Sequence, residues 1–194
     1  MVHFKICISG AARGDCLNEK TEDLARVLGE EIARQDCVLL TGATTGLPHF
    51  ACIGAKRLKG MSVGFSPAIS VKEHINKYRL PTNFMDLIIF TGYGYSGRNL
   101  MMIRSSDAVI FVCGRIGTLN EFTNAFEEDK PIGVLTQSGG ISDEIADIVE
   151  VAKRGSKDIF YDDDPVALVK KIANHLKDHH NQNSTSHPRG KDRG

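Results

Sequence analysis

Four segments of the sequence combine glycine with hydroxyl side chains directly after an apolar run. Glycine lets a ligand approach the backbone closely and hydroxyl groups add hydrogen-bond donors, so such segments suit a phosphate or another anion. Ordinary turns from strand to helix also need glycine, and one segment alone indicates little. Four of them at one edge of a sheet favour a nucleotide-like ligand. The candidate binding residues are Ser9, Gly10, Gly42, Thr44, Thr45, Gly46, Gly97, Gly114, Gly117 and Thr118.

Two charged side chains beside these segments are candidates for catalysis. Arg98 falls at the start of a predicted helix, where a cation opposes the helix dipole unless an anion lies nearby. A contact with a phosphate or with Glu121 would explain this position, and a solvated arginine is the alternative. Glu121 follows Thr118 at the spacing of a capping box, in which the carboxylate bonds to the backbone of the cap residue. The same carboxylate could instead act as a general acid or base, and the spacing leaves both interpretations open.

Other side chains in the same segments extend this candidate site. Arg13 and Arg115 could bind a phosphate, with an ordinary surface position as the alternative for each. Tyr93 and Tyr95 could stack on a base or simply pack at the rim. Cys113 ends a strand ahead of a helix, which can lower the pKa of a thiol, but a buried unreactive thiol is the preferred interpretation.

Several familiar motifs are missing from the sequence. No glycine-rich segment continues into Gly-Lys-Ser/Thr, none has Gly-x-Gly-x-x-Gly opening the first helix, and no Gly-x-Ser-x-Gly is present. P-loop ATP hydrolysis and standard dinucleotide chemistry are therefore not expected. The five cysteines make an odd number without a Cys-x-x-Cys or a Cys/His ligand spacing. We expect neither a disulfide framework nor a metal site.

The elements that would position these residues follow from the apolar pattern. Short apolar runs alternate with segments of helical period, which is typical of an α/β protein whose sheet is mainly parallel. Asn18 is placed to cap the first helix. We predict about seven strands, with helices on both faces of the sheet. The predicted strands are 4–9, 37–41, 61–65, 87–91, 108–113, 132–135 and 158–161, and the predicted helices are 19–35, 48–59, 71–77, 97–105, 118–128, 141–154 and 165–176.

Composition bounds the domain count and the partners. The 24 Lys and Arg balance the 24 Asp and Glu, so the sequence lacks the basic excess that nucleic acids or anionic membranes require. No apolar run is long enough to span a bilayer and no secretory signal is visible, so a cytoplasmic location is expected. Residues 1–177 are predicted to be one domain and residues 178–194 a disordered polar tail. The histidines of that tail are interpreted as solvated rather than as metal ligands.

Two stretches resemble a known group of nucleotide-binding proteins. Residues 113–121 read Cys-Gly-Arg-Ile-Gly-Thr-Leu-Asn-Glu, which resembles the Pro-Gly-Gly-x-Gly-Thr-x-x-Glu signature of the LOG (Lonely Guy) family and its relatives in the SLOG group, including molybdenum cofactor carrier proteins. Residues 41–48, Thr-Gly-Ala-Thr-Thr-Gly-Leu-Pro, resemble the Gly-Gly-x-x-x-Gly-Leu-Met/Pro segment of the same families. Arg98 resembles the arginine that LOG enzymes place ahead of their signature. The likeness covers roughly residues 4 to 135.

The resemblance implies a single Rossmann-like domain, usually a homodimer, that holds a nucleoside 5′-monophosphate or a related phosphorylated small molecule and needs no cofactor. LOG enzymes are phosphoribohydrolases that cleave a purine (cytokinin-type) nucleotide into free base and ribose 5-phosphate. Their catalytic arginine and glutamate correspond by position to Arg98 and Glu121. The alternative is a non-catalytic carrier or sensor of a nucleotide or of molybdenum cofactor.

This sequence also departs from the LOG pattern. Cys113 replaces the proline, Arg115 replaces the second glycine, and Asn99 stands where LOG enzymes usually have lysine. Arg115 adds a bulky cation where the family backbone is permissive, and Leu47-Pro48 is closer to the carrier-like relatives. Arg115 and the segment Gly46-Leu47-Pro48 favour the carrier or sensor, whereas the pair of Arg98 and Glu121 favours the enzyme.

Overall fold

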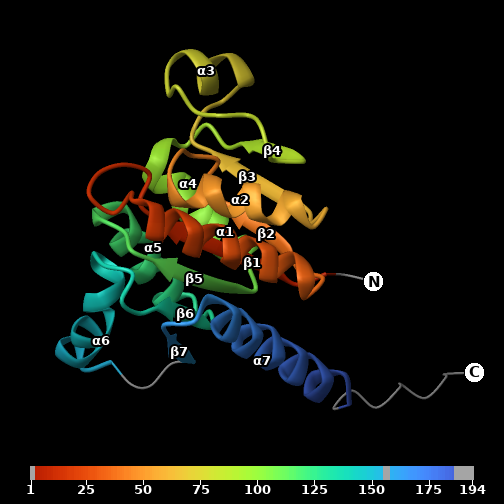
Figure 1. The fold of residues 1–194 in the computed structure, drawn as a ribbon, viewed down its shortest axis with the longest axis vertical. Helices are drawn as coiled ribbons and strands as arrows, with labels where there is room; N and C mark the ends of the chain where they lie inside the picture. The colour runs from red at the N-terminus through yellow and green to blue at the C-terminus, as the bar shows by residue number, and fades with distance from the viewer. Residues whose placement is uncertain (1–2, 155–157, 186–194) are drawn as a thin grey trace, which may run out of the picture.

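Seven parallel strands form one sheet in the computed structural model, which describes residues 3–154 and 158–185. Their order across the sheet is β4-β3-β2-β1-β5-β6-β7 (Figure 1). Strands β5 and β6 are buried along their whole length because helices cover both of their faces. This burial explains why their sequences are nearly continuous apolar runs. The strands are β1 (Lys5–Gly10), β2 (Val38–Thr41), β3 (Ser62–Ser66), β4 (Leu87–Phe90), β5 (Ala108–Val112), β6 (Ile132–Leu135) and β7 (Ile159–Asp162).

Seven helices within the described residues complete the α/β fold that the alternating pattern predicts. Helices α1, α2 and α7 cover one face of the sheet and α4, α5 and α6 the other, while α3 lies beyond the β4 end (Figure 1). Successive residues of β1 therefore enter different cores: Ile6 and Ile8 on the first face, Cys7 on the second. The helices are α1 (Glu19–Arg34), α2 (Leu47–Arg57), α3 (Val71–Asn76), α4 (Gly94–Ser105), α5 (Ile116–Glu127), α6 (Ile141–Ala152) and α7 (Pro165–Thr185).

The strand order reverses at β1, which pairs with β2 on one side and β5 on the other. Connections from β1 and β5 leave for opposite faces, so a crevice opens beyond their carboxyl ends. The register pairs Ser9 with Phe111 and Gly10 with Val112, which places the ends of the two strands level with each other. This edge of the sheet is where a ligand of a doubly wound fold binds.

Helices α1 and α2 pack unusually closely because each has a glycine at the contact. A Cβ on Gly29 of α1 would overlap the carbonyl oxygen of Ala51, and a Cβ on Gly54 of α2 would overlap that of Arg26. Asn18 caps α1 as predicted: its side chain accepts from Thr21 N, and the Thr21 hydroxyl accepts from Asn18 N.

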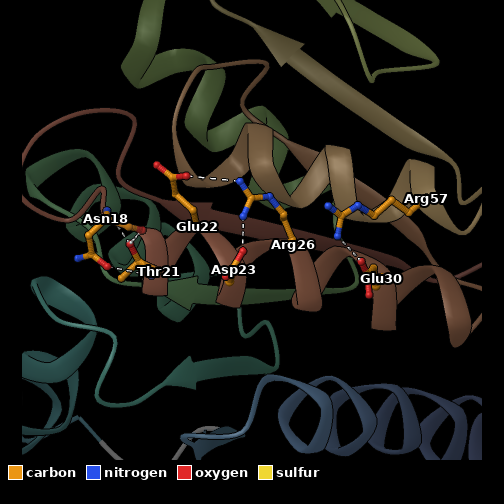
Figure 2. A network of polar contacts seen from close by, with 7 residues as sticks. All are labelled: Asn18, Thr21, Glu22, Asp23, Arg26, Glu30 and Arg57. Carbon is orange, nitrogen blue, oxygen red and sulfur yellow. Dashed lines mark hydrogen bonds and ion pairs between the residues drawn. The ribbon is translucent and has the colours of Figure 1, made fainter.

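Charged contacts surround this helix pair (Figure 2). Arg26 reaches Glu22 and Asp23 of its own helix, and Arg57 of α2 donates to Glu30 of α1 at 3.0 Å. The contacts are partly exposed, so each adds only a fraction of a kcal/mol, about 0.2 to 1. The glycine contact between the backbones, rather than these ion pairs, determines how closely α1 and α2 approach.

Two helix boundaries correct the sequence-based ones in ways that affect the site. Helix α5 begins at Ile116 with Arg115 as its N-cap, two residues before the predicted start at Thr118. Helix α4 begins at Gly94, three residues before the predicted start at Gly97. Both regions contain glycines, whose low helix propensity hides the first turn from a pattern-based prediction.

The structure also corrects the prediction that the polar segment after Lys177 is disordered from its first residue. Helix α7 continues to Thr185, although residues from Asp178 onward contain no large apolar side chain. Two side chains at this end of α7 contact the rest of the domain. The ring of His180 packs edge-on against Phe4, with ring centres 5.9 Å apart, and Lys177 Nζ donates to Gln35 at 3.2 Å. Residues 186–194 of the expected tail lie outside the described residues. Among the described residues, no helix has the length and apolarity required to cross a membrane.

Candidate functional site

A cavity of about 470 Å³ lies beyond the carboxyl ends of β1, β2 and β5. Its walls come from the segments after β1 and β2, from α4, and from the first turn of α5. Three arginines and one glutamate are the charged side chains of its lining. They are Arg13, Arg98, Arg115 and Glu121. This excess of positive charge fits an anionic ligand.

Glu121 lies at the buried end of the cavity, on the second turn of α5. It is 8% exposed, and Ser9, the second-last residue of strand β1, donates a hydroxyl hydrogen bond to its Oε2. The amide nitrogen of Asn99, turned toward the carboxylate, donates to Oε1 at 2.9 Å and to the Tyr95 carbonyl at 3.0 Å. Three elements, β1, α4 and α5, thus orient one carboxylate toward the cavity.

The capping-box interpretation of Glu121 is wrong. Arg115 is the N-cap of α5, and Thr118 lies inside the helix, so a carboxylate three residues later cannot return to the N-cap backbone. The side chains of Glu121 and Thr118 both line the cavity instead. The spacing of Thr118 and Glu121 matches a capping box only by coincidence, because Thr118 is not the N-cap of α5.

The environment of Glu121 changes its acidity. Burial raises the pKa of the carboxyl above the ordinary glutamate value of 4.5, while the nearby Arg98 cation and the Ser9 hydrogen bond act in the opposite direction. Burial has the larger effect. A carboxylate with a raised pKa is a stronger base than a solvated one, and it stands beside a cation that favours its charged form.

Arg98 is nearly as buried as Glu121, with 4% of its surface exposed. Its Nη1 lies 3.8 Å from Glu121 Oε1 and also 3.8 Å from Met102 Sδ, and its guanidinium lies 5.9 Å from the centre of the Tyr95 ring. Its Nε is buried and has no hydrogen-bond partner among the described residues. A buried cation with spare donors facing a cavity is suited to binding an anion.

Gly42 makes room for Arg98. A Cβ at position 42 would overlap Nη1 of the guanidinium, so any other residue would displace the arginine. The sequence places Gly42 among the phosphate-binding residues; in the structure it lines the cavity and also packs against Arg98. Its requirement for glycine comes from a side chain far away in the sequence.

The first turn of α5 offers free backbone donors to the cavity. Arg115, Ile116, Gly117 and Thr118 all line it, and no side chain caps this helix. The first N–H groups of a helix have no partner within the helix, and the helix dipole favours an anion there. A Cβ on Gly117 would meet nothing within 4 Å, so this glycine faces open space. A phosphate could approach the backbone here without obstruction.

Arg115 lines both the main cavity and a neighbouring second cavity of about 540 Å³. Its guanidinium packs over Gly14, where a Cβ would lie 3.0 Å from Nη1, and its side chain is exposed. Arg115 therefore lies at the exposed rim of the cavity, away from its buried end at Glu121. Arg13 lines the same cavity from the segment after β1.

A disulfide between Cys16 and Cys113 overturns the expectation that Cys113 is a buried unreactive thiol. It joins the segment after β1 to the segment after β5, the two segments that carry Arg13 and Arg115. Cys113 is thus neither a reactive nor a buried free thiol. Nothing in the spacing indicated the pair, because 97 residues separate the two cysteines and only the parallel pairing of β1 with β5 brings them together.

The other predicted residues divide into those that reach the cavity and those that support it. Gly10 and Thr44 line the cavity. Thr45 donates to the Ala12 carbonyl at 3.1 Å, and Gly46 is the N-cap of α2 with a positive φ of 73°. Gly97 packs on Tyr93, which is 70% exposed and outside the lining. Gly114 packs on the Thr118 side chain and lines the neighbouring second cavity. Ser9 acts through Glu121.

Several lining residues were not among the predicted site residues, and two of them add to the chemistry of the cavity. Asn99 completes the hydrogen bonding of Glu121, and Leu80 adds an apolar wall beside Tyr95. Helical spacing places Tyr95, Arg98 and Asn99 on one face of α4. A predicted helix beginning at Gly94 rather than Gly97 would have grouped Asn99 with the other two residues. Leu80 follows α3, outside every glycine-rich segment, and the sequence carries no signal for it.

Comparison with known proteins agrees with this fold. The chain is 27% identical to the molybdenum cofactor binding protein of Rippkaea orientalis, with a TM-score of 0.73 over 91% of this chain and 99% of the other. It is 24% identical to a structure of the Moco carrier protein from Chlamydomonas reinhardtii, with a TM-score of 0.75 over 92% of this chain and 99% of the other. The second likeness concerns the fold alone.

Two comparisons by sequence establish the family. An uncharacterised protein of Archaeoglobus fulgidus is 34% identical over 132 residues, which are 68% of this chain and 80% of that protein. The model of the SLOG cluster4 family matches residues 3–169, a range that includes the whole of the cavity lining. The chain therefore belongs to the SLOG cluster4 family.

Proposed function

We propose that this protein binds a nucleoside 5′-monophosphate and hydrolyses its N-glycosidic bond, releasing a purine base and ribose 5-phosphate. The observation that carries this proposal is Glu121: a buried carboxylate with a raised pKa faces the cavity beside Arg98 and serves no helix cap. A helix cap would have been a sufficient structural reason for the residue. In its absence, a role in chemistry explains why a charge is buried here.

Each part of the nucleotide has a matching wall. The phosphate is proposed to bind the first turn of α5, with Thr118 and the backbone at Gly117, while Arg115 and Arg13 lie at the rim. Tyr95 and Leu80 offer aromatic and apolar surface for the base. The ribose then lies near Glu121, between phosphate and base.

The proposed reaction assigns one proton to Glu121. Ionised Glu121 accepts a proton from a water molecule whose oxygen attacks C1′ of the ribose. The C1′–N bond breaks, its electron pair stays on the base nitrogen, and the protonated Glu121 returns the proton to that nitrogen. The negative carboxylate also stabilises positive charge on the ribose as the bond breaks. Arg98 orients the carboxylate and contacts the phosphate or ribose.

A substitution that preserves shape tests this role. Glu121→Gln keeps the size of the side chain but cannot accept a proton, so we expect a loss of about 10²- to 10⁴-fold in turnover. The assay incubates AMP, GMP and an N6-prenylated AMP with the protein and measures free base and ribose 5-phosphate by chromatography. Glu127→Gln, at the exposed end of the same helix, is the matched control and should retain activity.

A second candidate function has its own supporting observations. Arg115 and Arg13 add positive charge to the rim, and the similar structures from R. orientalis and C. reinhardtii are molybdenum cofactor proteins. We therefore keep carriage of a nucleotide or of molybdenum cofactor as the alternative. No base released from any nucleotide, together with a higher melting temperature on adding a nucleotide or the cofactor, would reject the hydrolase and support the carrier.

We further propose that the chain acts as a homodimer. Apolar side chains are exposed on three neighbouring elements at the β4 end of the sheet, which is typical of an interaction surface. They include Leu87 and Ile89 of β4, Val71 and Ile75 of α3, and Leu100 and Met101 of α4.

A further inference from the structure

Three potential metal ligands meet at the edge of the sheet opposite to the cavity. Asp158 directly precedes β7, at its amino end, whereas the cavity lies beyond the carboxyl ends of the strands. Helix α7 runs back along the sheet from the end of β7 and brings His175 and His179 to Asp158. The arrangement is thus separate from the residues proposed to bind the nucleotide.

The ligand atoms of the three side chains already lie close together. One ligand atom from each residue lies within 4.8 Å of the others, and Asp158 Oδ2 is 3.3 Å from His175 Nε2. In a tetrahedral site with bonds of about 2.0 to 2.1 Å, neighbouring ligand atoms are separated by about 3.4 Å. The pair of Asp158 and His175 already has this separation. Only His179, which is exposed, would need to rotate its side chain toward them.

The histidines have the spacing that a helix needs for two ligands. His175 and His179 are four residues apart, so both project from the same face of α7, with ring centres 4.3 Å apart. Two imidazoles at this spacing on one helix form half of the zinc site in helical His-x-x-x-His motifs. The ring of His175 is also supported by Phe160 of β7, whose centre lies 5.1 Å away.

We propose that Asp158, His175 and His179 bind one Zn²⁺ ion. Two imidazole nitrogens and one carboxylate oxygen are ligands that zinc accepts, and three protein ligands leave a fourth position for water. A hard ion such as Mg²⁺ prefers oxygen ligands and should bind poorly. Bound zinc would fasten α7 to the start of β7, the last strand of the sheet.

The sequence alone gave no reason to separate His179 from the predicted solvated tail. The apolar pattern of the last helix stops at Leu176, and Asp158 lies 21 residues before His179. Only the continuation of α7 beyond Lys177 places His179 one helical turn after His175.

Calorimetric titration of the tag-free full chain with ZnCl₂ tests the proposal. We expect one ion per chain, a rise in melting temperature with zinc, and no rise with the same concentration of MgCl₂. His179→Ala should weaken zinc binding by more than about tenfold, because even the loss of a residue that only supports a metal ligand has an effect of that size. His180→Ala removes a neighbouring imidazole from the same helix and should bind zinc as the wild type does.

A spectroscopic measurement separates a built site from loose binding. Co²⁺ substituted for zinc should give the strong visible absorption of a four-coordinate ion in the wild type and in His180→Ala, and lose it in His179→Ala and Asp158→Asn. Saturable binding that is equal in wild type and His179→Ala would assign the ion to other histidines and overturn the proposal. Absence of saturable zinc binding to the wild type would overturn it as well.

Discussion

At the scale of single residues, the site depends on how its neighbours control Glu121. Burial raises the pKa of this carboxyl, Arg98 and Ser9 lower it, and the outcome is a pKa above the ordinary 4.5. The proposed base must be ionised, so activity should fall as the pH decreases through this raised pKa. The acid limb of kcat/KM should therefore lie at a higher pH than an exposed glutamate would give.

Ser9→Ala offers a sharper form of this prediction. The Ser9 hydroxyl stabilises the ionised carboxylate, and its removal should raise the pKa of Glu121 further. The acid limb of kcat/KM should move to higher pH, with activity reduced a few-fold on that limb and nearly unchanged on the plateau. Ser105→Ala, which removes an exposed hydroxyl bonded only to the Met101 carbonyl among the described contacts, is the control. An unchanged limb in Ser9→Ala would contradict this role of Ser9.

At the scale of elements, close packing between α1 and α2 supports the segments around the cavity, since α2 begins directly after the second glycine-rich segment. Gly29→Ala places a Cβ onto the Ala51 carbonyl oxygen, and we expect the free energy of unfolding to fall by about 1 to 3 kcal/mol. Urea denaturation followed by circular dichroism measures the change.

Gly117→Ala is the matched control for this packing effect. It is also a helical glycine, but its Cβ would meet nothing within 4 Å, so alanine should leave the stability unchanged or raise it by up to about 1 kcal/mol. Equal stabilities of the two variants would mean that the α1–α2 contact adapts easily. The comparison separates steric overlap from the general effect of alanine in a helix.

At the scale of the whole molecule, one covalent link spans half of the chain. The Cys16–Cys113 disulfide closes a loop of 97 residues, and such a link restricts the unfolded chain far more than the folded one. A reductant should lower the free energy of unfolding by about 2 to 4 kcal/mol in the wild type and have no effect on Cys16→Ser/Cys113→Ser. Unfolding with and without reductant measures this difference.

The remaining cysteines provide a control for that experiment. Burial raises the pKa of the Cys7 thiol, and it raises those of Cys37 and Cys52 to about 11, so these thiols should react slowly with a labelling reagent in the folded protein. Reduction should expose two additional reactive thiols. An unchanged thiol count would show that the pair is already reduced. Disulfides are uncommon in the cytosol, so this count also tests the expected cytoplasmic location.

The sequence by itself determined the parts that depend on local pattern. Apolar periodicity predicted the α/β class and the strands, because a strand buried on both faces must be continuously apolar. Glycine-rich segments after β1, β2 and β5 indicated the edge at which a cavity forms. The likeness of residues 41–48 and 113–121 to LOG proteins agrees with the SLOG cluster4 family to which the chain belongs.

Only the tertiary structure decided what depends on contacts between distant segments. It showed that Glu121 bonds to Ser9 rather than to a helix cap, that Gly42 makes room for Arg98, and that Cys16 reaches Cys113. It also extended α7 to Thr185 and so placed His179 beside His175 and Asp158. In each case the partners are brought together by strand order and helix packing, and local spacing carries no information about contacts of that range.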